Sequence, residues 1–138
     1  MEEATRDLVR RRARERCEYC GLHQEHCELR HHIEHIIAKQ QGGSDDTENL
    51  ALACHRCNLR KGPNLTGIDP NTGQVVHLFH PRRDLWSQHF AFEGVRINGV
   101  TAIGRATPQV LDSNDPRRIE LRAEILKRLS QSYRDAAR

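Results

Sequence analysis

The sequence contains few of the residues that build a large hydrophobic core. Of its 138 residues, 36% are hydrophobic and only 4% are aromatic, whereas 30% are charged. A chain this short with so little apolar material buries a small core, and a bound metal ion is a usual additional source of stability. We therefore expect one compact domain, or a small core with an extension, that a metal site helps to hold together.

Long apolar runs are also absent. No stretch approaches the roughly 20 residues that cross a bilayer, and no signal-peptide core is found. We therefore expect a soluble cytoplasmic protein that makes no use of a membrane. In that compartment the five cysteines are expected to be thiols or metal ligands, and not disulfides.

Positive and negative charges are nearly balanced over the whole chain, but positive charge is clustered near its start. The formal net charge is +3, and the segment 6–16 holds six arginines against two acids. Such a basic segment predicts contact with a polyanion, which its arginines would make through phosphate oxygens. The alternative is a solvated helix face. The candidate nucleic-acid contacts in this segment are Arg10, Arg11 and Arg14.

The first half of the chain predicts a short mixed unit. A narrow apolar stripe predicts a helix over residues 1–16, and isoleucine-rich and alanine-leucine segments predict strands over 29–37 and 50–53. A Gly/Asp-rich loop separates the two strands. Residues 54–62 are compatible with a helix that Gly62-Pro63 ends.

The second half differs in pattern. A turn over 69–73 leads into a strand, Asn98-Gly99 between apolar residues predicts a hairpin, and a helix begins with Asp115 as its N-cap. We therefore predict a core at 1–62 and an extension at 63–138, packed together as one globular unit. The expected apolar face of the last helix comprises Ile119, Leu121, Ile125, Leu126 and Leu129.

Two pairs of cysteines share the same spacing. Cys17 and Cys20 form one pair, Cys54 and Cys57 the other, and each pair encloses two residues. Four thiolates close the tetrahedral shell of a structural zinc ion, and zinc binding would add folding free energy. The alternative is four reduced, buried cysteines. Three nearby residues could replace a ligand, although exposed loop positions are their expected place: His23, His26 and Cys27.

Between the cysteine pairs lie residues that a purely structural zinc site does not need. The motifs CEYCG, IEHII, GGSDDTENL and CHRCNLRKG follow one another in fixed order. This arrangement resembles the HNH endonuclease family, and the rest of the chain is similar to the tail of small stand-alone bacterial HNH proteins. The resemblance implies an α+β protein with a ββα-metal, treble-clef-like core, an N-terminal helix and a C-terminal hairpin and helix extension.

The resemblance also implies roles for individual residues. His35 matches the general base, Glu34 and Asn58 match the ligands of a catalytic metal, and Asn49 matches the residue that fixes the loop holding the imidazole. The family more often has aspartate at the position of Glu34 and often histidine at that of Asn58. Carboxylate and amide oxygens favour Mg²⁺ or Mn²⁺ at this second site.

The chemistry of phosphodiester hydrolysis agrees with these residue types. A neutral imidazole can take a proton from water, and one divalent ion can neutralise charge on the phosphate and leaving oxygens. The expected products carry 5′-phosphate and 3′-hydroxyl ends, with DNA as substrate and RNA left open. The flanking phosphates would be bound by Arg56, Arg60 and Lys61.

The other histidines and the strand geometry leave alternatives open. His32 shares a strand face with Glu34 and could reach the same ion, whereas His31 is expected to be solvated or to face DNA and His55 to lie on the surface. Glu34 and His35 should point to opposite faces unless the strand ends or twists there. The rival functions are a zinc-bound nucleic-acid module that does not cleave, and a subunit of a larger nuclease assembly.

Overall fold

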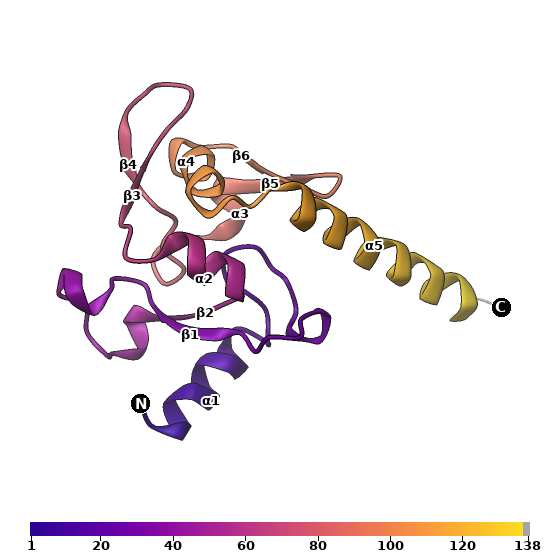
Figure 1. Ribbon diagram of the computed structural model, residues 1–138, viewed down its shortest axis with the longest axis horizontal. Helices are drawn as coiled ribbons and strands as arrows, with labels where there is room; N and C mark the ends of the chain where they lie inside the picture. Colours follow the sequence, from indigo (N-terminus) through magenta and orange to yellow (C-terminus); the bar gives the residue numbers. More distant parts are fainter. Residues whose placement is uncertain (137–138) are drawn as a thin grey trace.

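A computed structural model describes residues 1–136 of the chain. Within them, helices alternate with three two-stranded antiparallel sheets, which confirms the predicted α+β class (Figure 1). Short 3-10 turns cover Gln24–His26, Lys39–Gln41 and Thr47–Asn49. No helix in this part of the chain has the length and hydropathy of a membrane span.

The N-terminal helix α1 spans Glu3–Arg12 and is shorter than predicted. It ends because Arg14 and Glu15 adopt positive φ values of 55° and 60°, a conformation that no α-helix continues through. Its inner face places Val9 against Leu50 and Leu52 in a small apolar cluster. The helix is thereby fixed against the first sheet.

The first sheet and the following helix form the ββα unit. Strand β1 (His32–His35) pairs antiparallel with β2 (Leu50–Ala53), in a register that places His35 opposite Leu50. All of β2 is buried, and β1 is shorter than the predicted 29–37. Helix α2 (His55–Lys61) follows β2 after Cys54, whose sulfur accepts the N–H of Cys57, and Gly62 ends it as predicted.

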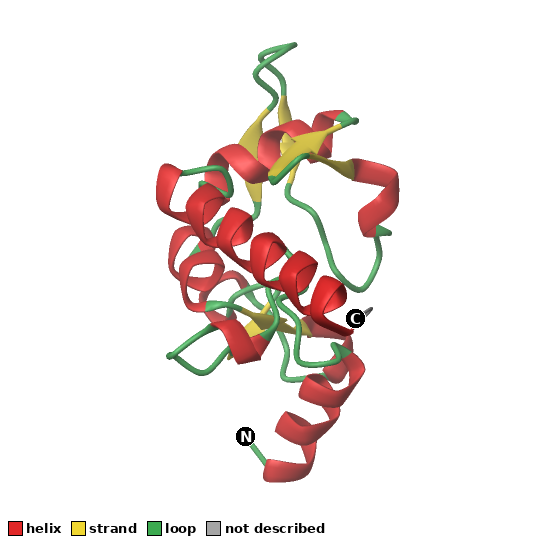
Figure 2. Ribbon diagram, turned by 90° about the vertical axis from the view of Figure 1, so that its right-hand side faces the viewer, coloured by secondary structure: helices red, strands yellow, loops and turns green. Residues whose placement is uncertain are grey.

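The C-terminal half holds two hairpins and three helices. Strands β3 (Thr66–Ile68) and β4 (Val75–His77) form one hairpin, and β5 (Phe90–Glu93) and β6 (Arg96–Gly99) form the other. Figure 2 shows these sheets at one end of the molecule and α1 at the other. The helices are α3 (Trp86–His89), α4 (Ala102–Leu111) and α5 (Pro116–Ala136).

The second hairpin turns at a different place from the predicted Asn98-Gly99. Its turn lies at Gly94 and Val95, with φ of +59° at Gly94, and Asn98-Gly99 forms the end of β6. Gly99 is needed for packing instead, because a Cβ there would lie 2.1 Å from the backbone of Gly104 in α4. The glycine that indicated a turn therefore marks a close helix–strand approach.

One apolar cluster joins the two halves of the chain. It combines the four paired cysteines and Tyr19 with aromatic and aliphatic residues of the extension, among them Leu78, Phe79, Phe90 and Leu111. Helix α5 departs from this cluster and projects from the body (Figure 1). Its predicted apolar face is consequently not covered: Leu126 and Leu129 are 55% and 58% exposed.

Candidate functional site

The four paired cysteines converge into one buried cluster. Their sulfur atoms all lie within 4.8 Å of one another, and the sulfurs of Cys20 and Cys54 are 3.8 Å apart. Four sulfurs bound to zinc at about 2.3 Å in a tetrahedron would be about 3.8 Å apart. The cluster therefore fits a structural zinc ion. Cys27, His23 and His26 are not members of it within residues 1–136.

The thiols of this cluster differ in the direction in which their pKa values are shifted. Burial raises the pKa of Cys17 well above its usual value. Hydrogen bonding from Cys17 lowers the pKa of Cys20 well below it. A zinc ion would displace the protons that remain, because only thiolates ligate it.

A guanidinium from the extension reaches the sulfurs. Arg118, in the first turn of α5, places Nη2 2.8 Å from the Cys57 sulfur and 3.8 Å from that of Cys54. Its Nη1 donates to the carbonyl oxygen of Leu111 at 2.9 Å, and the side chain is 5% exposed. No local pattern predicts this contact, because Arg118 and Cys57 are 61 residues apart.

The carboxylate of Glu34 is buried between β1 and α2. Its Oε1 lies 2.8 Å from Lys61 Nζ and accepts the Tyr19 hydroxyl at 3.0 Å, and Lys61 also donates to the carbonyl oxygen of Ile36 at 2.8 Å. Burial raises the pKa of Glu34, although the contacts with Lys61 and Tyr19 oppose that rise. Oε2 is buried and has no hydrogen-bond partner within residues 1–136.

His35 points to the other side of the strand. Its Nε2 lies 2.8 Å from Oδ1 of Asp45, and Oδ2 of the same carboxylate lies 2.8 Å from Lys39 Nζ. These contacts with Lys39 and His35 lower the pKa of Asp45, which keeps the carboxylate ionised. The predicted alternation of Glu34 and His35 thus holds, and the two side chains have separate partners.

Asn49 ties down the loop that follows His35. Its Oδ1 accepts the N–H of Ile37 at 2.9 Å, and its Nδ2 donates to the carbonyl oxygens of Ile37 and Ser44 at 3.0 and 2.8 Å. Glycine at position 43 lets the loop pack closely against Ile37, because a Cβ there would lie 1.7 Å from the Ile37 oxygen. The loop that contains Asp45 is therefore held at both ends.

His55, Asn58 and Lys61 follow one another at three-residue spacing along α2, and the side chains of His55 and Lys61 contact β1. At the start of α2, His55 Nδ1 lies 3.1 Å from Nε2 of His32, with ring centroids 5.4 Å apart. Taken together, the distance between the nitrogens and the distance between the centroids show that the two nitrogens face each other directly, as in a hydrogen bond between imidazoles. His32 is thus engaged with His55, which is exposed as predicted.

Residues 17–64 match the model of the HNH endonuclease family. This segment is an HNH domain. No curated protein and no solved structure was found to match the chain. The HNH domain covers both cysteine pairs, β1, β2 and α2, and indicates a function related to nucleic-acid cleavage.

Several basic side chains of the HNH domain and α1 are placed differently from the sequence prediction. His31 is not solvated: it is 1% exposed, and its Nε2 contacts the carbonyl oxygen of Leu22 at 2.8 Å. Lys61 is buried against Glu34, and Arg10 is buried with Nη2 donating to the carbonyl oxygen of His31. Their long side chains satisfy interior oxygens and leave no surface charge for a phosphate.

The other predicted phosphate contacts remain at the surface. Arg11 and Arg14 are exposed, as are Arg56 and Arg60 on α2. The last two are already paired with acids of the extension, Arg56 with Asp115 at 3.3 Å and Arg60 with Asp112 at 3.4 Å. Binding of a nucleic acid through α2 would have to compete with these pairs.

Proposed function

We propose that the protein is a metal-dependent endonuclease that hydrolyses phosphodiester bonds of DNA. The observation that carries the proposal is the contact of His35 with Asp45 within an HNH domain. If Nε2 carries the proton that Asp45 accepts, Nδ1 of the imidazole is left as the base. No hydrogen bond to Nδ1 is found within residues 1–136, so this nitrogen is free to take a proton from water.

The residues around His35 would act on its orientation and charge. Asp45 would hold the ring and stabilise the imidazolium that forms when water gives up its proton. Asn49 would keep the loop, and with it Asp45, in place through its three hydrogen bonds. The activated water would attack phosphorus and leave 5′-phosphate and 3′-hydroxyl ends.

A catalytic divalent ion would be held by Glu34 and Asn58, with His32 as a further candidate. The fit rests on Glu34 Oε2, a buried acceptor without a partner among the described residues, and on the oxygen chemistry of the two side chains. Glu34 and His35 face opposite sides of β1, but β1 ends at His35. Such an ion, Mg²⁺ or Mn²⁺, would therefore have to lie at that end of the strand to neutralise negative charge on the same phosphate. The ammonium of Lys61 on the other oxygen weakens the carboxylate's attraction for that ion.

DNA as the partner is supported by the charge beside β1. A pocket of about 710 Å³ is lined by Arg6, Arg10, Arg30 and His32 together with two acids of α1. Arg6 and Arg30 are exposed at this pocket, whereas Arg10 is buried and bonded to the carbonyl oxygen of His31. The two exposed guanidinium groups would bind phosphates of a DNA backbone.

The rival function is a zinc-bound module that binds DNA without cutting it, which the pairing of Glu34 with Lys61 favours. A supercoiled plasmid distinguishes the two. With Mg²⁺ or Mn²⁺ the zinc-loaded protein should convert it to nicked or linear forms, and EDTA should stop the reaction. Retarded migration of the plasmid without any nicking in either metal would support the binding module and contradict the nuclease hypothesis.

A further inference from the structure

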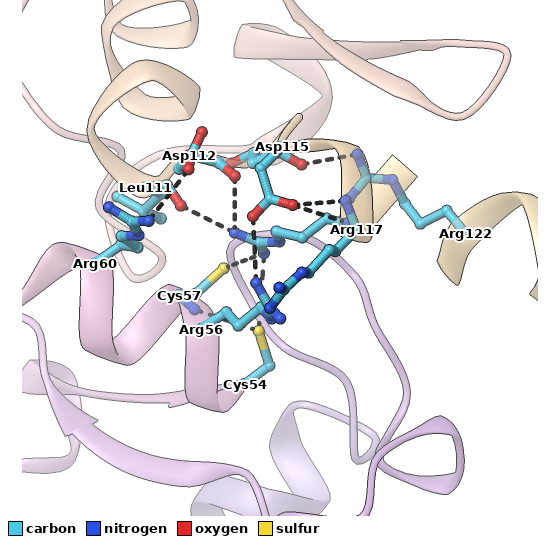
Figure 3. Close-up of polar contacts among 11 residues, drawn as sticks. Cys54, Arg56, Cys57, Arg60, Leu111, Asp112, Asp115, Arg117 and Arg122 are labelled. Atoms are coloured by element: carbon cyan, nitrogen blue, oxygen red, sulfur yellow. Dashed lines mark hydrogen bonds and ion pairs between the residues drawn. The ribbon is translucent and has the colours of Figure 1, made fainter. Parts of the chain in front are cut away.

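Three charged contacts join α2 to the segment Leu111–Arg118 of the extension. Arg56 pairs with Asp115 and Arg60 with Asp112 (Figure 3). Cys57 receives the guanidinium of Arg118. The first two contacts lie at the surface, where ion pairs contribute little to stability. The third is buried and involves a metal-ligating sulfur, so it differs in kind from the other two.

Charge balance explains why an arginine is placed there. A zinc ion with four thiolates carries a net charge of −2, and this cluster is buried among apolar side chains. Hydrogen-bond donors to ligating atoms stabilise such a site and commonly change metal affinity by 10-fold to 100-fold. Arg118 is the one cationic side chain found to donate to these sulfurs within residues 1–136.

The shape of the guanidinium links the metal site to the extension. Nη2 donates to Cys57 while Nη1 donates to Leu111, whose carbonyl oxygen is at the end of α4. Asp115 holds the same turn from outside, because its Oδ1 accepts the N–H groups of Arg117 and Arg118. An ammonium at this position could not span both acceptors with the same geometry.

We propose that Arg118 is a positioning residue of the zinc site, and that it couples zinc retention to docking of Leu111–Arg118 on α2. The thiolates give the buried guanidinium its counter-charge, and the guanidinium stabilises the thiolates. The two equilibria are thermodynamically linked. If docking of the segment through Arg118 raises the affinity for zinc by some factor, bound zinc raises the docking equilibrium of the segment by the same factor. The proposal goes beyond cleavage and holds whether or not the HNH domain cuts DNA.

The first test is the rate at which zinc leaves the full-length protein for a colorimetric chelator. Arg118→Met should release zinc about 10-fold to 100-fold faster than the wild type. The release rate of Arg118→Lys should fall between the two, since lysine keeps the positive charge but lacks the two donor nitrogens of the guanidinium. Arg117→Met is the matched control, because Arg117 is exposed on the same turn and its side chain is found in no contact with a sulfur among the described residues. Its release rate should stay within about threefold of the wild type.

Equal release rates for wild type, Arg118→Met and Arg117→Met would overturn the proposal. If Arg118→Met does not accumulate as folded protein, the comparison of Arg118→Lys with Arg117→Met decides it by the same criterion. A second readout is amide hydrogen exchange of zinc-loaded Arg118→Lys. Exchange should rise over residues 111–118 and stay unchanged in β1 and β2; unchanged exchange over 111–118 contradicts the coupling.

Discussion

At the scale of single residues, the carboxylate of Asp45 should matter to cleavage through His35. Asp45→Asn keeps the size of the side chain but removes the charge that stabilises the imidazolium and orients the ring. We expect the initial rate of plasmid nicking to fall by roughly 10-fold to 100-fold. Asp46→Asn, a change at an exposed neighbour, serves as the control and should leave the rate unchanged.

The pH dependence of that effect follows from the pKa of Asp45, which its contacts with Lys39 and His35 lower. The carboxylate is therefore ionised throughout the range above its ordinary pKa of about 3.9. Wild-type nicking should accordingly remain faster than Asp45→Asn nicking throughout about pH 6 to pH 8. A ratio of the two rates that approaches one within this range would mean that the charge of Asp45 has no part in the reaction.

Single residues also show what the sequence could and could not predict. The cysteine ligands could be predicted because their spacing is local and the chemistry of four thiolates is specific. The roles of Asp45 and Arg118 could not, since their partners are 10 and 61 residues away and the resemblance implies no role for either residue. Lys61 and His31 were expected at the surface, where lysine in particular usually lies, but contacts with interior acceptors bury both side chains.

At the scale of elements, the Glu34–Lys61 pair is expected to hold β1 against α2. Lys61→Met removes the cation and leaves a buried carboxylate, which should lower the free energy of unfolding by about 3–5 kcal/mol. The matched change Arg60→Met breaks an exposed pair on the same helix and should cost at most about 1 kcal/mol. Denaturant unfolding of zinc-loaded protein at pH 8 measures both.

The companion change Glu34→Gln in the Lys61→Met background separates charge from packing. It removes the unpaired negative charge and should restore part of the lost stability. If the single and double variants unfold at the same denaturant concentration, the carboxylate is not what destabilises Lys61→Met. If Lys61→Met is no less stable than Arg60→Met, the buried pair does not join the strand to the helix.

Elements differ in how far the sequence determines them. The ββα unit could be predicted because its strands, loop glycines and helix stop are all local signals. Helix α4 was missed, since Gly104 and Pro108 lower the helical propensity of its segment. Gly104 is required by the tertiary contact with His89, whose carbonyl oxygen would lie 1.8 Å from a Cβ there. Packing, and not propensity, therefore sets this helix.

At the scale of the whole molecule, Asp69 links the first hairpin of the extension to α4. The carboxylate is fully buried and accepts two hydrogen bonds from Arg105, at 2.8 and 2.9 Å. The hydrogen bonds from Arg105 lower the pKa of Asp69 well below its ordinary value. The stability that this ionised group provides is therefore present above its unfolded pKa of about 3.9 and is lost as the pH falls further.

We expect Asp69→Asn to lower the melting temperature at neutral pH. The deficit relative to wild type should shrink as the pH is lowered below about 4, because the wild type loses this contribution there. Thermal melts of both proteins across pH 3–7 measure it. A deficit that stays constant down to pH 3 would show that the lost stability does not come from ionised Asp69.

The molecule as a whole depends on contacts that no local pattern encodes. Its core joins the HNH domain to the extension through the zinc cysteines, so the predicted division at residue 62 stays a prediction about folding units. Most of α5 lies outside this core, although its apolar periodicity predicted burial. Periodicity reports which face is apolar, but only the packing of the neighbours decides whether that face is covered.

The central claim is that His35 is the general base of a nuclease, and the cleavage rate of zinc-loaded His35→Ala tests it most directly. His26→Ala is the control, because the His26 ring lies 3.3 Å from the Glu25 carboxylate and, within residues 1–136, is not one of the side chains that cluster with the cysteine ligands. We predict that His35→Ala cleaves supercoiled plasmid about 10²-fold to 10⁴-fold more slowly than wild type while still binding it. Cleavage by His35→Ala at the wild-type rate would contradict the account.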